Sequence, residues 1–178
     1  MNEKIFRSEK EKPWQPLEII PYATQYPDDI LKELQKPYEE RSYVNQGHGE
    51  ISLDGSPLWS EGFSFCAAML LQNTRSPEAA LLHIDGIDLN YEHQVPLLRK
   101  LSSEEKYDVF FIRGTLSRDL KSRILESDGF TKVVKPERIY QDICFETGKQ
   151  HWGLFYKPKE RMLYLDSRKN KQLLCYKI

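Results

Sequence analysis

Two apolar segments joined by turn residues restrict the possible folds of this chain more than any other feature. Phe63 to Gln72 is apolar on both faces of an extended chain, and Ala79 to Asp85 is a second apolar run. A strand that is apolar on both faces is typically buried on both faces. Because Asn73 to Pro77 has turn chemistry, we expect the two segments to form a buried antiparallel hairpin.

The remaining pattern predicts short strands and a few helices around this hairpin. Strands are expected near Ile51 and Leu53, at 107–112, around 133–134, at 152–156 and at 162–166. Helices are expected at 28–35, 89–101 and 117–127. This order predicts an α/β (α+β) fold, a single domain with a mostly antiparallel β-sheet core flanked by helices.

The first 45 residues differ from the rest, because prolines interrupt them at positions 13, 16, 21, 27 and 37. Each proline removes a backbone donor and biases the preceding residue toward extended structure. A chain of 178 residues suits one domain of ordinary size with some length left over. We therefore expect residues 1–45 to form an N-terminal arm that wraps a core domain at residues 46–178.

Composition excludes several functional classes. The chain carries 26 Lys and Arg against 27 Asp and Glu, which argues against a nucleic-acid partner. The longest purely apolar run, Phe65 to Leu71, is too short for membrane insertion as a helix. No apolar signal peptide opens the sequence, and three cysteines do not fit a disulfide scaffold. We expect a cytoplasmic protein, in a bacterium or, for a delivered effector, in the host cytosol.

A cysteine and a histidine face each other in the predicted hairpin. If the hairpin turns between Thr74 and Arg75, Cys66 and His83 lie directly opposite, with Cβ atoms roughly 4.5–5.5 Å apart. This prediction requires a loop of even length, because a one-residue slip would put the two side chains on opposite faces. A thiolate is a nucleophile, and a neighbouring imidazole can remove the thiol proton or stabilise the thiolate as imidazolium.

Each of these residues also has a structural interpretation. A buried free cysteine is more often an inert small hydrophobe, and a lone histidine in a strand is more often a hydrogen-bonded core residue. Ser60 and Asp85 are both candidates for the group that orients the imidazole. Cys144 is expected to pack in a strand, and Cys175 to be exposed near the C-terminus. The three cysteines lack metal-ligand spacing, so we expect no metal and no cofactor.

At these positions the sequence resembles the CheD family of chemoreceptor glutamine deamidases. It is also similar to the wider group of cysteine deamidases that includes toxins of the cytotoxic necrotizing factor type. Family members carry a cysteine at the start of a strand, a histidine on the next strand, and a threonine hydroxyl six residues before the cysteine. Here Ser60 stands at the hydroxyl position, Gly62 matches a family glycine, and His83 follows Cys66 by 17 residues.

The resemblance implies a CheD-like deamidase domain whose partner is a protein bearing a reactive glutamine. It implies that Cys66 attacks the side-chain carboxamide, that His83 exchanges the proton, and that Ser60 orients His83. The sequence departs from the family at Ser64-Phe65, where CheD has Gly-Ser, and at Ser60, where CheD has threonine. A transglutaminase, a cysteine peptidase and a non-catalytic protein-binding module on the same fold remain alternatives.

Overall fold

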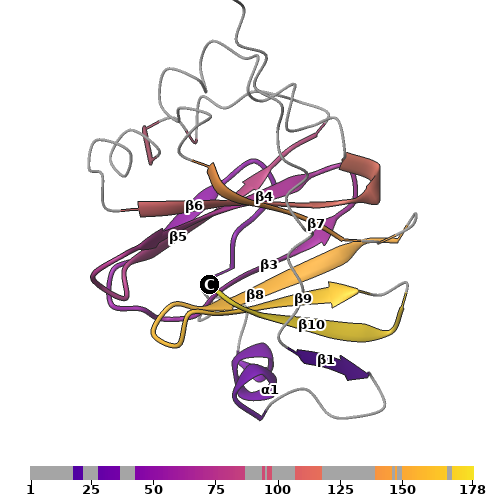
Figure 1. Cartoon of the computed structure of the whole chain (residues 1–178), viewed down its shortest axis with the longest axis horizontal. Coiled ribbons are helices and arrows are strands. Elements are labelled where there is room, and N and C mark those ends of the chain that lie inside the picture. The colour runs from indigo at the N-terminus through magenta and orange to yellow at the C-terminus, as the bar shows by residue number, and fades with distance from the viewer. Residues whose placement is uncertain are drawn as a thin grey trace, which may run out of the picture.

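Two five-stranded sheets form the framework of the chain (Figure 1). The computed structural model describes residues 18–21, 28–36, 43–86, 94, 96–97, 107–117, 139–145, 147, 150–167 and 170–178. Sheet A has the strand order β1-β10-β9-β8-β3, and sheet B has the order β2-β5-β4-β6-β7. Neighbouring strands are antiparallel except β6 and β7, which are parallel.

The elements have the following bounds. Helix α1 spans Asp28–Gln35, and the strands are β1 (Glu18–Pro21), β2 (Gly49–Ser52), β3 (Leu58–Phe63), β4 (Ala67–Asn73), β5 (Ala79–Ile84), β6 (Tyr107–Gly114), β7 (Ile139–Phe145), β8 (Trp152–Lys157), β9 (Met162–Ser167) and β10 (Gln172–Lys177). A short 3₁₀ helix, Thr115–Ser117, follows β6.

The main hydrophobic core lies between the two sheets. Sheet B contributes alternate residues such as Ala68, Leu70 and Leu81, while sheet A contributes residues such as Leu154 and Leu165. Each of these side chains is at most 2% exposed. All seven residues of β4 are buried, which confirms the prediction of a strand that is apolar on both faces.

The predicted mostly antiparallel β core is confirmed, but it consists of two sheets rather than one. The predicted strand Phe63 to Gln72 is wrong at its start, because Phe63 ends β3 in sheet A and β4 begins at Ala67 in sheet B. A bend at Ser64 and Phe65 separates the two strands. The chain therefore crosses from one sheet to the other immediately before β4, at Ser64–Cys66.

The flanking helices are not confirmed. Helix 28–35 is present as α1, and it is the only α-helix with defined bounds among the described residues. The predicted helix 117–127 lies outside them except for Ser117, which ends the 3₁₀ helix. Most of the predicted helix 89–101 and the predicted strand at 133–134 also lie outside the described residues.

Two described elements of the predicted arm contact sheet A. Strand β1 pairs with β10 and forms an edge of the sheet. Helix α1 lies beside sheet A (Figure 1), where Ile30 packs in a second cluster with Trp59, Phe155 and Tyr164. The division into an arm and a core domain stays a prediction. In the described part of the chain, no helix combines the length and apolar character needed to cross a membrane.

Candidate active site

Cys66 lies at the crossover between the sheets, directly before the first residue of β4. Its side chain is 5% exposed and belongs to the core cluster between the sheets, together with Ala68 and Leu70. The neighbouring Phe65, in contrast, is 52% exposed. The thiol is therefore at the margin of the core, with an exposed aromatic ring beside it in the chain.

The predicted direct opposition of Cys66 and His83 is wrong by two residues along β4. In the hairpin, Ala68 is opposite His83, and Gln72 is opposite Ala79. The loop is Thr74–Pro77, closed by a hydrogen bond from Asn73 N–H to Glu78 O, so it turns one residue later than expected.

The even loop length preserves the predicted common face. Because Cys66 precedes Ala68 by two residues, Cys66 and His83 still project from the same side of sheet B. If the register is continued past Ala67, they are diagonal neighbours, which lie roughly 7–8 Å apart, with Cβ atoms somewhat closer, instead of roughly 5 Å. The larger separation agrees with the absence of a hydrogen bond between the thiol and the imidazole.

Ser60 on β3 and His83 on β5 form a hydrogen-bonded relay across the sheets. The Ser60 hydroxyl donates to the Val44 carbonyl oxygen at 2.6 Å, and its oxygen lies 2.9 Å from His83 Nδ1. The single hydroxyl proton of Ser60 is donated to Val44 O. The contact between Ser60 and His83 therefore requires a proton on Nδ1, which donates it to the Ser60 oxygen. This tautomer leaves His83 Nε2 as a bare acceptor.

His83 Nε2 is buried and has no hydrogen-bond partner among the residues that the structure describes. His83 as a whole is 1% exposed. An unpartnered lone pair is less costly to bury than an unpartnered N–H, which agrees with the tautomer that the Ser60 relay requires. An unprotonated ring nitrogen is the form of histidine that accepts a proton from a thiol.

An aromatic stack fixes the plane of the imidazole. The His83 ring lies 3.8 Å from the Phe63 ring, which in turn lies 4.1 Å from the Trp152 ring, and both pairs are close to parallel. Phe63 reaches the core because β3 has a bulge between Ser60 and Phe63, with Gly62 at φ +79°. The extra residue reverses the alternation of the strand and turns Phe63 inward.

The backbone of His83 is held from both sides. Its N–H donates to His48 O, and its carbonyl oxygen accepts hydrogen bonds from Gly47 N–H and from the Gln94 side-chain amide. The Gln94 side chain is 1% exposed and also donates to His48 O. These contacts fix the imidazole in place without using either of its ring nitrogens.

The two candidate catalytic groups are both neutral near pH 7. Burial lowers the pKa of His83 to about 4, although the Asp85 carboxylate acts in the opposite direction. Burial also raises the pKa of the Cys66 thiol, and Asp85 adds to this increase. The resting pair is therefore a thiol and a neutral imidazole, and not a thiolate–imidazolium ion pair.

Of the two candidates for the orienting group, Ser60 lies within hydrogen-bond distance of the His83 ring, whereas Asp85 acts on His83 through its charge and raises its pKa. Asp85 accepts a 2.7 Å hydrogen bond from the Gln46 amide. The other cysteines differ from their expectations: Cys144 is exposed rather than packed, and Cys175 is 1% exposed rather than accessible. The described residues contain no group of three or more His, Cys, Asp or Glu suited to a metal ion.

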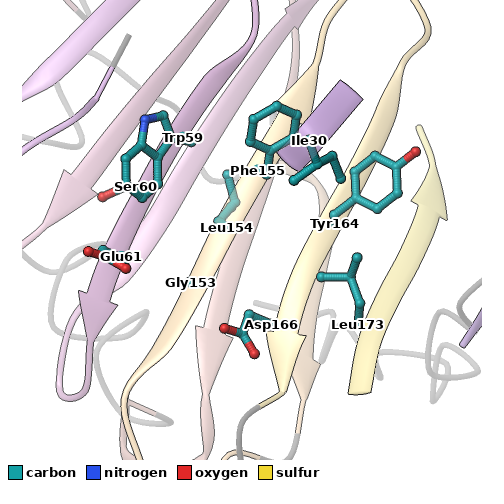
Figure 2. A pocket seen from close by; sticks show the side chains of 10 residues that line it. All are labelled: Ile30, Trp59, Ser60, Glu61, Gly153, Leu154, Phe155, Tyr164, Asp166 and Leu173. Atoms are coloured by element: carbon teal, nitrogen blue, oxygen red, sulfur yellow. The ribbon is translucent and has the colours of Figure 1, made fainter. Parts of the chain in front are cut away.

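A cavity of about 80 Å³ lies on the opposite side of sheet A, next to α1 (Figure 2). Its walls include Ile30, Trp59, Phe155 and Tyr164, with the carboxylates of Glu61 and Asp166 toward one end. It is far smaller than the roughly 300–1,000 Å³ of typical ligand pockets. Ser60 also lines this cavity, whereas the imidazole of His83 lies between the sheets.

Two groups at the site carried no recognisable signal in the sequence. Val44 contributes only a backbone carbonyl, so no side-chain pattern identifies it. Gly86 touches the Cys66 peptide, and a glycine after a strand is ordinarily read as a turn residue.

The search against protein-family models found no matching family, and the search of curated proteins found no match either.

Proposed function

We propose that the protein is a cysteine-dependent protein-glutamine deamidase, with Cys66 as nucleophile, His83 as general base and Ser60 as the residue that orients His83. The observation that carries this proposal is the Nε2 of His83, which has no hydrogen-bond partner among the described residues and lies on the face of the hairpin where Ala68 and, by strand alternation, Cys66 project. A buried imidazole held by Ser60, with its free nitrogen left as an acceptor, is suited to removing a thiol proton. The resemblance of the Ser60–Cys66–His83 spacing to CheD supports the amide of glutamine as the substrate.

The reaction runs through a thioester. The Cys66 sulfur attacks the side-chain carbonyl carbon while the thiol proton passes to His83 Nε2. The carbon–nitrogen bond then breaks, and His83 returns the proton to the departing ammonia. Water attacks the thioester, gives a proton to Nε2, and releases glutamate as the carbon–sulfur bond breaks and the Cys66 thiol is restored. The net change is hydrolysis of a carboxamide to a carboxylate and ammonia.

The neutral resting pair favours proton transfer during the attack over a preformed ion pair. The diagonal separation of Cys66 and His83 must shorten when substrate binds, so that Nε2 comes within hydrogen-bond reach of the thiol. Catalytic hydrogen bonds are often long before substrate binds and tighten in the Michaelis complex. Cys66 stands between the bend at Ser64 and Phe65 and the first residue of β4, so its backbone is not held in a strand ladder.

A peptide mass-spectrometric comparison tests the proposal. Purified wild-type protein and Cys66→Ala are each incubated with a bacterial lysate and with a eukaryotic cell lysate, and every glutamine site is quantified. We expect specific glutamines to gain about one dalton only with the wild type, with release of ammonia. Chain cleavage would instead identify a peptidase, and amine attachment at glutamine would identify a transglutaminase. Identical samples from the two proteins would contradict catalysis and favour a binding module.

A further inference from the structure

Gly86 is the closest backbone neighbour of the Cys66 peptide. It follows β5 and would be opposite Phe65 if the pairing of Ala67 with Ile84 continued by two residues. A Cβ atom at Gly86 would lie 1.8 Å from the Phe65 carbonyl oxygen and 2.6 Å from its carbonyl carbon. Both are backbone atoms, so no side chain fits at Gly86 unless the Phe65–Cys66 peptide moves.

The requirement for glycine here is steric. Gly47 and Gly62 have φ of +78° and +79°, with open space where a Cβ atom would stand. Gly86 has no positive φ, and it is the contact with Phe65 that excludes a side chain. Glycine is therefore required at position 86 because the Phe65–Cys66 peptide approaches its Cα closely, and not because the backbone there adopts a turn conformation.

Backbone hydrogen bonding at Gly86 and at Ser64 acts to lower the pKa of the Cys66 thiol, against the larger opposing effect of burial. Hydrogen bonds to a charged acceptor are roughly twice as strong as neutral ones. Asp85 is the charged group that acts on the sulfur, and it opposes ionisation, while His83 is neutral. The stabilisation of a thiolate at Cys66 therefore comes from the two backbone amides.

We propose that Gly86 is a positioning residue for the nucleophile: its bare Cα admits the Phe65–Cys66 peptide, and this contact directs the Gly86 N–H at the Cys66 sulfur. The proposal deepens the proposed function, on which its catalytic meaning rests. The interaction of the Gly86 N–H with the Cys66 sulfur exists in the free protein, so it can be measured without any substrate.

A first experiment observes the contact in the unmodified protein. The amide resonance of Gly86 is followed by ¹⁵N NMR between about pH 7 and about pH 10.5, in wild type and in Cys66→Ala. We expect the Gly86 amide proton to move downfield as the thiol ionises in the wild type, and to stay unchanged in Cys66→Ala. The Gly153 amide serves as reference. A Gly86 amide that behaves alike in both proteins would overturn the proposal.

A second experiment adds the side chain. Iodoacetamide alkylation of Cys66 is measured against pH in Gly86→Ala and in Gly153→Ala, where the new Cβ atom meets its neighbours at 3.5 Å or more. Loss of one hydrogen bond to the thiolate should slow alkylation in Gly86→Ala about tenfold at a given pH, with the profile displaced to higher pH. Gly153→Ala should match the wild type.

The two experiments separate a positioning role from a structural one and from the proposed function. If Gly86→Ala does not fold, the NMR comparison still decides, because it leaves Gly86 in place. A lower melting temperature with an unchanged alkylation profile would overturn the proposal. A protein that shows the Gly86 response but converts no glutamine would retain Gly86 as a positioning residue and contradict only the deamidase.

Discussion

The Ser60 hydroxyl of sheet A lies 2.9 Å from the Nδ1 nitrogen of His83 in sheet B. Because Ser60 donates its own proton to Val44, and because hydrogen bonding to the Val44 backbone also acts on the His83 ring, the contact favours a proton on Nδ1. One hydroxyl therefore links the two layers of the fold to the protonation state of the candidate base.

Replacing Ser60 with alanine should remove control of the His83 tautomer. We expect kcat for glutamine conversion to fall about tenfold or more, with a smaller change in KM, because the base is then protonated at either nitrogen. Ser60→Thr keeps the hydroxyl and should restore most of the rate. Ring ¹⁵N shifts of His83 provide the direct readout, and a single unchanged tautomer in Ser60→Ala would contradict the relay.

The buried imidazole should make folding stability depend on acid. The pKa of His83 falls from 6.5 to about 4 on folding, so the unfolded chain binds the extra proton between these values. The contribution of His83 to the free energy of unfolding is fully present above about pH 6.5. It is lost as the pH falls toward 4, and the total loss is about 3 kcal/mol.

Urea unfolding at a series of pH values measures this effect. The decline between pH 6.5 and 4 should be shallower in His83→Gln than in the wild type, after each curve is referred to its own value at pH 7. His48→Gln changes an exposed histidine and is the control for the loss of an imidazole. Equal slopes in all three proteins would show that His83 is not buried in its neutral form.

The three cysteines should label at different rates. Cys144 is exposed, whereas Cys66 and Cys175 are buried, and burial raises the pKa of Cys175 to about 11. Near pH 7, iodoacetamide should therefore modify Cys144 first and the other two far more slowly. Site-resolved mass spectrometry gives the order. Fast labelling of Cys66 below pH 7, slowed by His83→Ala, would instead indicate an ion pair in the resting protein.

Phe65 should contribute to substrate binding, because its exposed ring is adjacent to the nucleophile. We expect Phe65→Ser to raise KM for a converted protein substrate about tenfold, as the loss of one buried aromatic contact predicts, and to leave kcat nearly unchanged. Leu53 is 66% exposed in the loop after β2, away from Cys66, so Leu53→Ser is the matched control. Equal KM values for the two variants would remove Phe65 from the substrate surface.

The sequence predicted the hairpin well because both of its strands are apolar throughout and its turn is rich in turn-forming residues. The shared face of Cys66 and His83 was predicted on condition that the loop has an even length, and Ser60 was one of two candidates, beside Asp85, for the group that orients the imidazole. The predicted partner of His83 was wrong by two residues, because the turn is centred one residue later than expected and the residues around it have similar composition. An even loop length determines which side chains share a face of the hairpin, but it does not determine which residues pair across the two strands.

The two-sheet arrangement could not be read from the pattern. Phe63 is as apolar as the residues after it, so nothing in composition marks the boundary between β3 and β4. The boundary depends on the Gly62 bulge and the bend at Ser64 and Phe65, which are visible only once strand partners are known. The contact of Gly86 with Phe65 is likewise a product of tertiary structure.

The crossover at Ser64–Cys66 has one more consequence. Cys66 is joined directly to β4 of sheet B and, through Ser64 and Phe65, to β3 of sheet A, so a partial separation of the sheets should change its surroundings early. The buried thiol of Cys66 is therefore a built-in reporter of sheet opening. Its modification rate relative to that of Cys175 distinguishes local opening at the crossover from unfolding of the whole domain.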